Sequence, residues 1–362
     1  MATRDSTNYQ LLMTNYQLPI TMNQHATDEI YQSNILTGVS RTFALTIPQL
    51  PPVLCKVVSN GYLLCRIADT IEDEPDLTLV QKKQLSQEFI QVVAGESDPL
   101  VFSQALFPLL SDSTSAAEKE LIFNTPRVIR LTHRFTPPQR AALHRCVRIM
   151  AKGMADFQQN SSLEGLKDLP EMDRYCYYVA GVVGEMLTDL FCDYSPHIAQ
   201  HKAQLQSQAV SFGQSLQMTN ILKDIWEDRQ RGACWLPREV FARAGFDLKN
   251  LRPGHYDPAF GDGLTELIAV AHTHLHNALR YTLLIPPNEK GIRRFCLWAL
   301  GMAILTLRRI FNKRDFCLGQ QVKISRRSVK ATILVSNLAT SSDTTLRTIF
   351  YLLTRTLPIH FN

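Results

Sequence analysis

Glycine is scarce in this chain, with 16 residues among 362. So little glycine disfavours repetitive β architectures and glycine-rich phosphate loops. The eight cysteines include no CxxC pair, and most of them lie in apolar runs. We therefore expect buried free thiols in a reducing compartment, and neither a disulfide framework nor a zinc site. Alternating apolar and polar residues, the pattern of a half-buried strand, are also missing.

Long runs of basic residues and long runs of apolar residues are missing as well. The net charge is +5, but the basic residues are spread out without aromatic residues between them, so we expect no nucleic-acid binding. The mild positive charge is compatible with an anionic substrate or membrane surface, and equally with an ordinary solvated surface. The N-terminus has no signal-peptide core, and no stretch reaches the roughly 18 apolar residues of a membrane span. The longest candidate, residues 296–307, predicts a buried helix.

What the chain does contain is the material for one helical domain. It is 45% hydrophobic and 20% charged, and apolar residues recur at intervals of three and four in most segments. We predict a single all-α domain of roughly a dozen helices over residues 28–362, with no linker dividing it. Residues 1–27 are polar and contain Thr-Asn-Tyr-Gln-Leu twice, which predicts a disordered leader.

Residues 69–73, Asp-Thr-Ile-Glu-Asp, form a first acidic motif on an otherwise apolar helix predicted over residues 53–74. Four polar residues share one face of this helix at helical spacing: Tyr62, Arg66, Asp69 and Asp73. Carboxylates on a buried helix are costly unless something compensates them, and a divalent cation would do so. The alternative is a solvated helix face on which Arg66 is a salt-bridge partner.

A second acidic motif, Asp-Ile-Trp-Glu-Asp at residues 224–228, repeats this form on a helix predicted over residues 203–228. Gln217 and Asn220 precede Asp224 at helical spacing, so a polar stripe again follows a buried helix. Two facing carboxylate pairs provide hard oxygen ligands, which suit Mg²⁺ that keeps some waters and bridges to substrate phosphates. The repetition of the stripe disfavours the solvated alternative.

Basic residues occur near both motifs and could meet phosphate oxygens: Arg41, Arg66, Lys223 and Arg231. Paired aspartates with such neighbours are typical of a site that ionises an allylic diphosphate. The metal stabilises the departing diphosphate, and an apolar, aromatic pocket holds the carbocation.

Four segments then give a specific resemblance. Ser-Arg-Thr-Phe at 40–43, the two acidic segments at 62–73 and 217–228, and YCYYVAGVVG at 175–184 stand in the order and spacing of squalene synthases. Over about residues 28–335, the chain resembles this family, which belongs to the head-to-head branch of prenyl synthases with phytoene and dehydrosqualene synthases. The resemblance implies an all-α isoprenoid synthase bundle with a central active-site cavity.

The resemblance also implies roles for individual residues. The metal ligands would be Asp69, Glu72, Asp73, Asn220, Asp224 and Asp228. Diphosphate contacts would come from Ser40, Arg41, Tyr62, Arg66, Gln217, Asn220 and Lys223. Tyr175 would assist proton removal, and the four motif aspartates and Phe295 would complete the catalytic set. The cofactor NADPH would lie at a basic segment, with contacts to Lys323, Arg326 and Arg327.

The implied reaction joins two molecules of farnesyl diphosphate to presqualene diphosphate with Mg²⁺, and then reduces and rearranges this intermediate to squalene with NADPH. The alternatives are a dehydrosqualene or phytoene synthase, a presqualene diphosphate synthase and, from another class, a non-catalytic assembly protein with the same fold. The intact acids and Tyr175 disfavour the last. We expect a cytoplasmic monomer with peripheral membrane contact, and a bacterial-type enzyme because no C-terminal membrane anchor follows.

Some positions depart from the family pattern. Residues 295–300 read FCLWAL where the family has Phe-Cys-x-x-Pro-Gln, and the basic segment is shifted. Lys223 stands where many members have arginine, so a bidentate phosphate contact becomes a point charge. His272 and His276 lie at i, i+4 without a third ligand and predict a solvated helix face. A last helix around residues 346–353 is expected to pack on the core, or to lie on a membrane.

Overall fold

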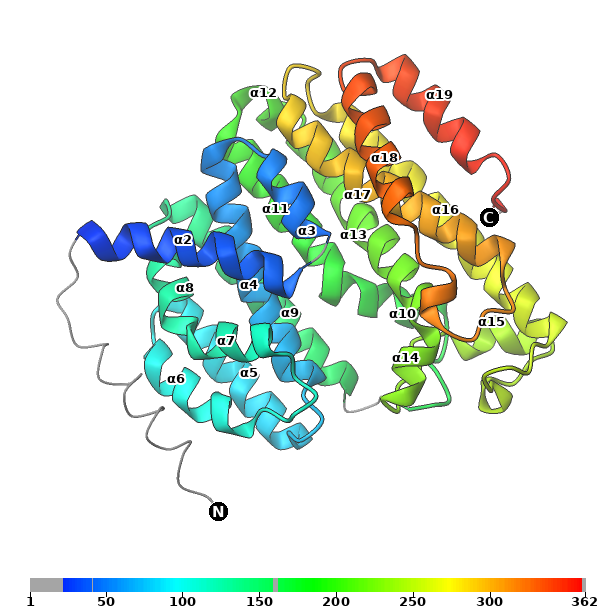
Figure 1. Cartoon of the computed structure of the whole chain (residues 1–362), viewed down its shortest axis with the longest axis horizontal. Helices are drawn as coiled ribbons and strands as arrows, with labels where there is room; N and C mark the ends of the chain where they lie inside the picture. Colours follow the sequence, from blue (N-terminus) through cyan, green and yellow to red (C-terminus); the bar gives the residue numbers. More distant parts are fainter. Residues whose placement is uncertain (1–21, 41, 159–161, 360–362) are drawn as a thin grey trace.

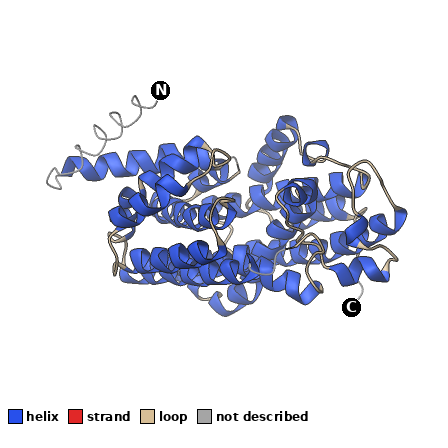
Figure 2. Cartoon of the chain, turned by 90° about the horizontal axis from the view of Figure 1, so that it is seen from below, coloured by secondary structure: helices blue, strands red, loops and turns tan. Residues whose placement is uncertain are grey.

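The structure is a computed structural model that describes residues 22–40, 42–158 and 162–359. Within these ranges the chain is helical, and the β structure is limited to one isolated bridge between Leu166 and Pro237. Figure 2 shows the helices packed side by side without a sheet. The predicted all-α fold is confirmed.

The helices fall into two groups along the chain. The first group is α2 (Met22–Val39), α3 (Phe43–Thr46), η2 (Ile47–Gln49), α4 (Pro52–Asp73), α5 (Leu79–Ala94), α6 (Pro99–Leu106), η3 (Phe107–Leu109), α7 (Ala116–Phe123), α8 (Thr125–Thr132) and α9 (Pro137–Gln158). The second is α10 (Leu169–Cys176), η4 (Tyr177–Gly181), α11 (Val182–Tyr194), α12 (Pro196–Ala199), α13 (Lys202–Lys223), α14 (Ile225–Gln230), α15 (Arg238–Arg243), η5 (Leu248–Asn250), α16 (Pro258–Leu284), α17 (Lys290–Asn312), η6 (Gly319–Gln321), α18 (Arg326–Ala339) and α19 (Asp343–Thr354). Figure 1 shows the groups side by side, and α11 packs against both α9 and α13 where they meet.

The interior of the described residues contains two large clusters of buried apolar side chains, one around α4 and α9 and the other around α13, α16 and α17. A third, small cluster consists of Leu297, Ala339 and Leu346. Val179 and Phe212 pack against both clusters, so the interior is continuous between the groups. The division into a leader and one domain stays a prediction, although α2 begins at Met22, ahead of the start expected at Asp28.

Helix α4 carries the first acidic motif and lies close to the bounds predicted for it. It begins at Pro52, where a proline is tolerated in the first turn, and it ends at Asp73, shortly before Pro75. Asn60 is completely buried on its inner face and donates to Val128 O at 3.0 Å and to Gln32 Oε1 at 3.1 Å. These bonds fix α4 against α8 and α2, so the helix that presents the acids is rigidly placed.

One helix predicted as continuous contains a π turn, and another is broken. The helix predicted over residues 174–192 continues from α10 through the π turn η4 into α11, and α13 packs closely against η4. A Cβ at Gly213 would lie 2.1 Å from Ala180 O, so only glycine fits there. The helix over residues 203–228 ends at Lys223, and Asp224, with φ −101° and ψ 17°, separates α13 from α14. The second acidic motif therefore begins at a helix junction.

Helix α18 is a further correction, because residues 323–330 were expected only as a basic segment before the last helix. Ser325 caps α18 by accepting a hydrogen bond from Ser328 N at 3.1 Å. The inner face of α18 lies on α17, where Trp298 Nε1 donates to Asn337 Oδ1 at 3.2 Å. Packing on α17 thus stabilises a helix that the sequence does not predict, because its first turn is charged.

Two expectations about apolar and histidine-bearing helices also need correction. Helix α17 does have the length and composition of a membrane span, but 61% of its apolar window is buried inside the protein. His272 is buried rather than solvated, because the chain after α19 covers it and Pro358 O lies 3.0 Å from its Nδ1. The final helix packs on the core through Phe350, as expected. The eight cysteines are free, as predicted.

Candidate active site between the two acidic motifs

The first acidic motif lies beside a cation that is held from several sides. Arg66 Nη1 lies 4.0 Å from Asp69 Oδ2 and 3.6 Å from Glu118 Oε1. Arg66 Nη2 donates to Tyr62 OH at 3.0 Å, and that hydroxyl donates to Val39 O at 3.1 Å. The Nε of Arg66 is buried without a hydrogen-bond partner.

Glu118 is a member of this site that the sequence did not reveal. Its Oε2 accepts from the backbone N and Oγ of Ser115 at 3.1 and 2.7 Å, which forms the capping box of α7. The pattern Ser-x-x-Glu predicts such a cap, but nothing in the spacing predicts that α7 packs beside α4. The cap leaves Oε1 of Glu118 free to face Arg66.

Burial and neighbouring charge disfavour the ionised form of Asp69. Burial raises the pKa of Asp69 to about 6, an effect that Arg66 opposes and that Asp73 and Glu118 reinforce. Burial also raises the pKa of Asp73, although Arg231 and Arg66 counteract it. These carboxylates therefore lack sufficient positive charge around them.

The second acidic motif has the same deficit. Lys223 Nζ lies 3.0 Å from Asp224 Oδ2 and donates to Asn220 Oδ1 at 3.2 Å. Burial raises the pKa of Asp224, with Lys223 opposing. Burial raises the pKa of Asp228 to about 7, with contributions from Asp224 and from Asp73. The effect of Asp73 on Asp228 means that charges of the first motif are felt in the second.

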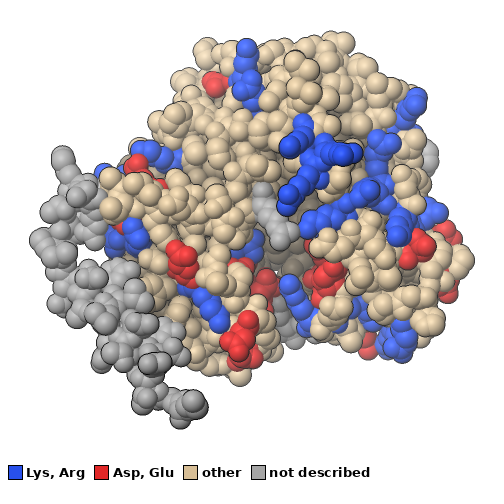
Figure 3. All heavy atoms as spheres, viewed as in Figure 1, with Lys and Arg blue, Asp and Glu red and all other residues tan. Residues whose placement is uncertain are grey.

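The ends of the two motifs lie close together, and a hollow opens between the two groups of helices. Figure 3 shows this hollow between the two groups of helices, with acidic and basic side chains on both of its sides. Arg231, just after α14, places Nη1 3.9 Å from Asp73 Oδ1. Within the described residues, no three His, Cys, Asp or Glu side chains lie close enough to hold one metal ion by themselves. The acids of the two motifs are nevertheless close enough to interact electrostatically, because Asp73 contributes to the raised pKa of Asp228.

Tyr175 lies in an aromatic wall near these acids. Its ring stacks on that of Trp235, with the ring centroids 4.0 Å apart and an interplanar angle of 7°. It also makes an edge-to-face contact with Phe157, at a centroid distance of 5.4 Å. Burial raises the pKa of Tyr175 well above its usual value, and the charges of Glu72, Asp73 and Asp228 raise it further. The phenol therefore stays protonated beside the acids, with π faces around it that suit a cation.

Other predicted residues lie at varying distances from this centre. Ser40 accepts a hydrogen bond from Phe43 N at 2.9 Å, and Arg41 lies outside the described residues. Gln217 is half-buried on α13. Phe295 is buried in the core and makes an edge-to-face contact with Phe191, with the ring centroids 6.2 Å apart. The structure thus brings the acids, Tyr62, Arg66 and Tyr175 together and places Phe295 in the surrounding apolar packing.

The basic segment lies at the start of α18. Lys323, Arg326 and Arg327 are exposed, and the two arginines occupy the first turn of the helix. Positive side chains there oppose the helix dipole unless an anion lies between them and the helix N-terminus. This arrangement is suited to phosphate groups of a ligand.

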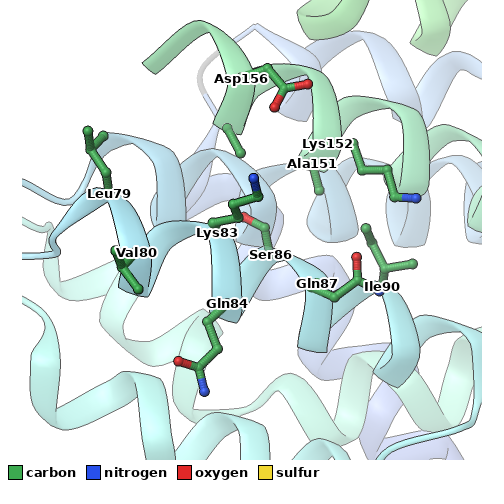
Figure 4. Close-up of a pocket in the computed structure, with 11 residues that line it drawn as sticks. Leu79, Val80, Lys83, Gln84, Ser86, Gln87, Ile90, Ala151, Lys152 and Asp156 are labelled. Atoms are coloured by element: carbon green, nitrogen blue, oxygen red, sulfur yellow. The ribbon is translucent and has the colours of Figure 1, made fainter. Parts of the chain in front are cut away.

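A surface groove of about 900 Å³ lies elsewhere, between α5 and α9. Figure 4 shows Lys83 on α5 and Lys152 and Asp156 on α9 among the residues that line it. None of the predicted site residues lines this groove. A much smaller cavity next to it includes Glu72 in its wall.

The family model described as Squalene/phytoene synthase matches residues 36–328, and the chain belongs to this family. It is 29% identical over 306 residues to "Squalene synthase ERG9" of Saccharomyces cerevisiae and 30% identical over 295 residues to "Squalene synthase ERG9" of Gibberella zeae. These alignments cover 83% and 80% of this chain, and 66% and 60% of the relatives, so the chain spans less than two thirds of their length.

Solved structures show the same fold. A structure described as TcSQS with a ligand has a TM-score of 0.72 at 23% identity, and the alignment covers 93% of this chain and 94% of the other. A dehydrosqualene synthase in complex with a ligand has a TM-score of 0.63 at 20% identity, covering 86% of this chain and 96% of the other. At these identities the likeness establishes the fold alone.

Proposed function

We propose that this protein is a squalene synthase. Two molecules of farnesyl diphosphate join head to head to give presqualene diphosphate, which then rearranges and is reduced to squalene. The observation that carries this proposal is the pairing of the two acidic motifs across one hollow, with Arg231 lying 3.9 Å from Asp73. The similarity to curated squalene synthases supports squalene as the product.

The donor set of the site fits Mg²⁺. The carboxylates are hard oxygen ligands, and the raised pKa values of Asp69 and Asp228 reflect a lack of positive charge that a divalent ion would supply. We propose Asp69, Glu72 and Asp73 as ligands on one side. Asn220, Asp224 and Asp228 are the proposed ligands on the other. Held by these residues, Mg²⁺ would supply positive charge that stabilises the leaving diphosphate.

The chain's own cations and aromatic groups complete the proposed site. Arg66 offers its unpartnered Nε to a diphosphate oxygen, and Lys223 offers a second positive charge on the opposite side. Ser40, Arg41, Tyr62 and Gln217 are proposed as further diphosphate contacts. Tyr175 presents a protonated hydroxyl and a π face to the carbocation, and Phe295 contributes to the apolar surroundings.

We propose the start of α18 as the binding site of the cofactor. The exposed cations Lys323, Arg326 and Arg327 would contact the phosphates of NADPH, because the helix N-terminus adds backbone N–H groups that favour an anion. When bound, NADPH supplies the hydride that ends the second half-reaction.

We also propose a cytoplasmic monomer that contacts the membrane through the outer faces of α18 and α19. Leu338 is 81% exposed and Tyr351 is 64% exposed there, and Lys330, Arg347 and Arg355 on the same two helices and just after them are basic. An apolar face bordered by cations suits an anionic lipid surface, into which a hydrocarbon product would partition.

Incubation of the purified protein with farnesyl diphosphate and Mg²⁺, with and without NADPH, tests the proposed function. We expect presqualene diphosphate without NADPH and squalene only with it. Dehydrosqualene in both reactions would instead indicate the related synthase, and presqualene diphosphate alone in both would indicate an enzyme that stops after the first half. No turnover in either reaction, with a folded protein, would support the assembly protein.

A further inference from the structure

The second acidic motif is tied to the chain segment that follows α17. This segment, residues 313–322, is called the strap. Gly319 N donates to Glu227 Oε1 at 3.1 Å, and Trp226 Nε1 donates to Phe316 O at 2.7 Å. Two consecutive residues of the second acidic motif, both on α14, thus hold the strap by two separate hydrogen bonds.

The contact between Gly319 and Glu227 leaves no room for a side chain at position 319. A Cβ at Gly319 would lie 2.8 Å from Glu227 Oε1 and 3.0 Å from Lys223 O, so a larger residue would displace the carboxylate or lift the strap. The other oxygen of Glu227, Oε2, is buried and has no hydrogen-bond partner. The Glu227 carboxylate is therefore directed at the strap, and its position depends on the strap staying in place.

The strap is a compact segment that leads directly to the basic segment. Phe316 is 2% exposed and Val322 is completely buried, so the strap is anchored in the core at Phe316 and at its C-terminal end. Between them, Cys317 N donates to Gln321 Oε1 at 2.9 Å and closes the loop on itself. Lys323 follows immediately, and its carbonyl oxygen accepts from Arg309. Because the strap is held at these points, we expect a shift of α14 to move the start of α18 as well.

We propose that Glu227 and Gly319 are positioning residues that couple the diphosphate site to the cofactor site. Binding of a magnesium diphosphate at Asp224 and Asp228 fixes α14, and α14 holds the strap through Glu227 and Trp226. The strap in turn sets the position of Lys323, Arg326 and Arg327. A hydride donor therefore binds tightly only when a diphosphate occupies the acidic motifs. This inference rests on the proposed function for the identity of the two ligands.

Such a coupling keeps the dinucleotide bound while a diphosphate substrate or intermediate occupies the acidic motifs. Reduction is required only after presqualene diphosphate has formed, and a site completed by bound diphosphate keeps the dinucleotide engaged during that period. Because coupling between two binding sites is reciprocal, NADPH must also tighten the binding of diphosphate by the same factor.

The test measures the dissociation constant of NADPH with the full chain, by the change in tryptophan fluorescence, with and without Mg²⁺ and inorganic pyrophosphate. No turnover is needed. We expect NADPH to bind the wild-type protein at least about fivefold more tightly when magnesium pyrophosphate is present, which is the lower end of typical couplings. Equal affinity in the two conditions, or no binding of NADPH in either, would overturn the proposal.

Variants separate the strap contact from general damage. Gly319→Ala is expected to reduce the coupling to about onefold while pyrophosphate still binds, and to raise the KM for NADPH more than it lowers the rate of the first half-reaction. Leu318→Ala is the matched control, because Leu318 is 50% exposed, adjoins Gly319 and has no polar side-chain group to offer Glu227. It is expected to keep the wild-type coupling. Full coupling in Gly319→Ala, or its loss in Leu318→Ala, would contradict the assignment.

Trp226→Phe provides a second route if Gly319→Ala does not fold. This change removes the 2.7 Å hydrogen bond to Phe316 O and keeps an aromatic ring in the core. Circular dichroism checks the fold, and calorimetry replaces fluorescence because a tryptophan is lost. We expect weaker coupling than in the wild type, and unchanged coupling would overturn the proposal. A wild-type protein that shows the coupling but leaves farnesyl diphosphate unchanged would refute the proposed function alone.

Discussion

Arg231 Nη1 lies 3.9 Å from Asp73 Oδ1, which joins the loop after the second acidic motif to the end of the first. The two residues come from the two different groups of helices and from opposite halves of the chain. This contact places a positive charge between two sets of carboxylates whose pKa values are raised. The relationship shows that the fold brings the ends of both motifs together.

Replacing this cation is expected to weaken diphosphate binding. Arg231→Gln removes one charged partner, and such charged contacts are worth about 1.5–3 kcal/mol, so we expect at least roughly tenfold weaker binding of magnesium pyrophosphate. Calorimetric titration measures it. Arg238→Gln is the matched control, because Arg238 is a comparably exposed arginine that pairs with Glu164 at 3.7 Å. Equal affinities in the two variants would contradict the role of Arg231.

The stability of the metal-free protein is expected to fall as the pH rises from about 4 to about 7. The sign follows from the raised pKa values of Asp69, about 6, and Asp228, about 7, because the folded protein then holds protons that the unfolded chain has released. Asp228→Asn removes one of these groups. Its melting temperature should exceed that of the wild type by a few degrees at pH 8 and match it at pH 4. Thermal melts in the presence of a chelator check this, and an equal loss at both pH values would contradict it.

Tyr175→Phe tests the hydroxyl without disturbing the aromatic packing. The stacking on Trp235 at 4.0 Å is kept, so the fold should be unchanged. We expect about a 100-fold lower rate of presqualene diphosphate formation, as for the loss of a proton-transfer group. Initial rates with farnesyl diphosphate and Mg²⁺ measure it, with Tyr178→Phe as the matched control. A full rate in Tyr175→Phe would remove this residue from the mechanism.

Asp28 is predicted to stabilise the first group of helices. It is 1% exposed, and it accepts from Arg127 Nε at 2.8 Å and from Arg130 Nε at 2.9 Å. Asp28→Asn leaves two guanidinium groups without their charged partner, and we expect a loss of about 3 kcal/mol in the free energy of unfolding. Urea denaturation measures it. The neighbouring change Glu29→Gln, in an exposed pair with Lys56, should cost less than about 1 kcal/mol.

The part of the site that could be predicted lies on α4. The period of the α-helix is sufficient to place Tyr62, Arg66, Asp69 and Asp73 on one face. The prolines around residue 52 and at Pro75 set the ends of the helix. Carboxylates in a single polar stripe on an apolar helix need a compensating charge, so the local pattern already indicates a binding role.

The rest depends on contacts between segments distant in sequence. Glu118 reaches Arg66 only because α7 packs beside α4, and a capping box carries no information about that neighbour. The break at Asp224 is also hidden, since the backbone bond from Asp228 N to Asp224 O is kept and the spacing of the acids stays helical. Gly319 is one glycine in a loop until the structure places it against Glu227.

The central claim is that the two acidic motifs form one diphosphate site. A double-mutant cycle on the binding of pyrophosphate with Mg²⁺ tests it most directly, with Asp73→Asn, Asp228→Asn and the double variant. We expect each single change to weaken binding at least about tenfold and the double variant to lose clearly less than the product of the two, because both residues hold one ligand. A single change that leaves the dissociation constant unaltered, or losses that multiply independently, would contradict the claim.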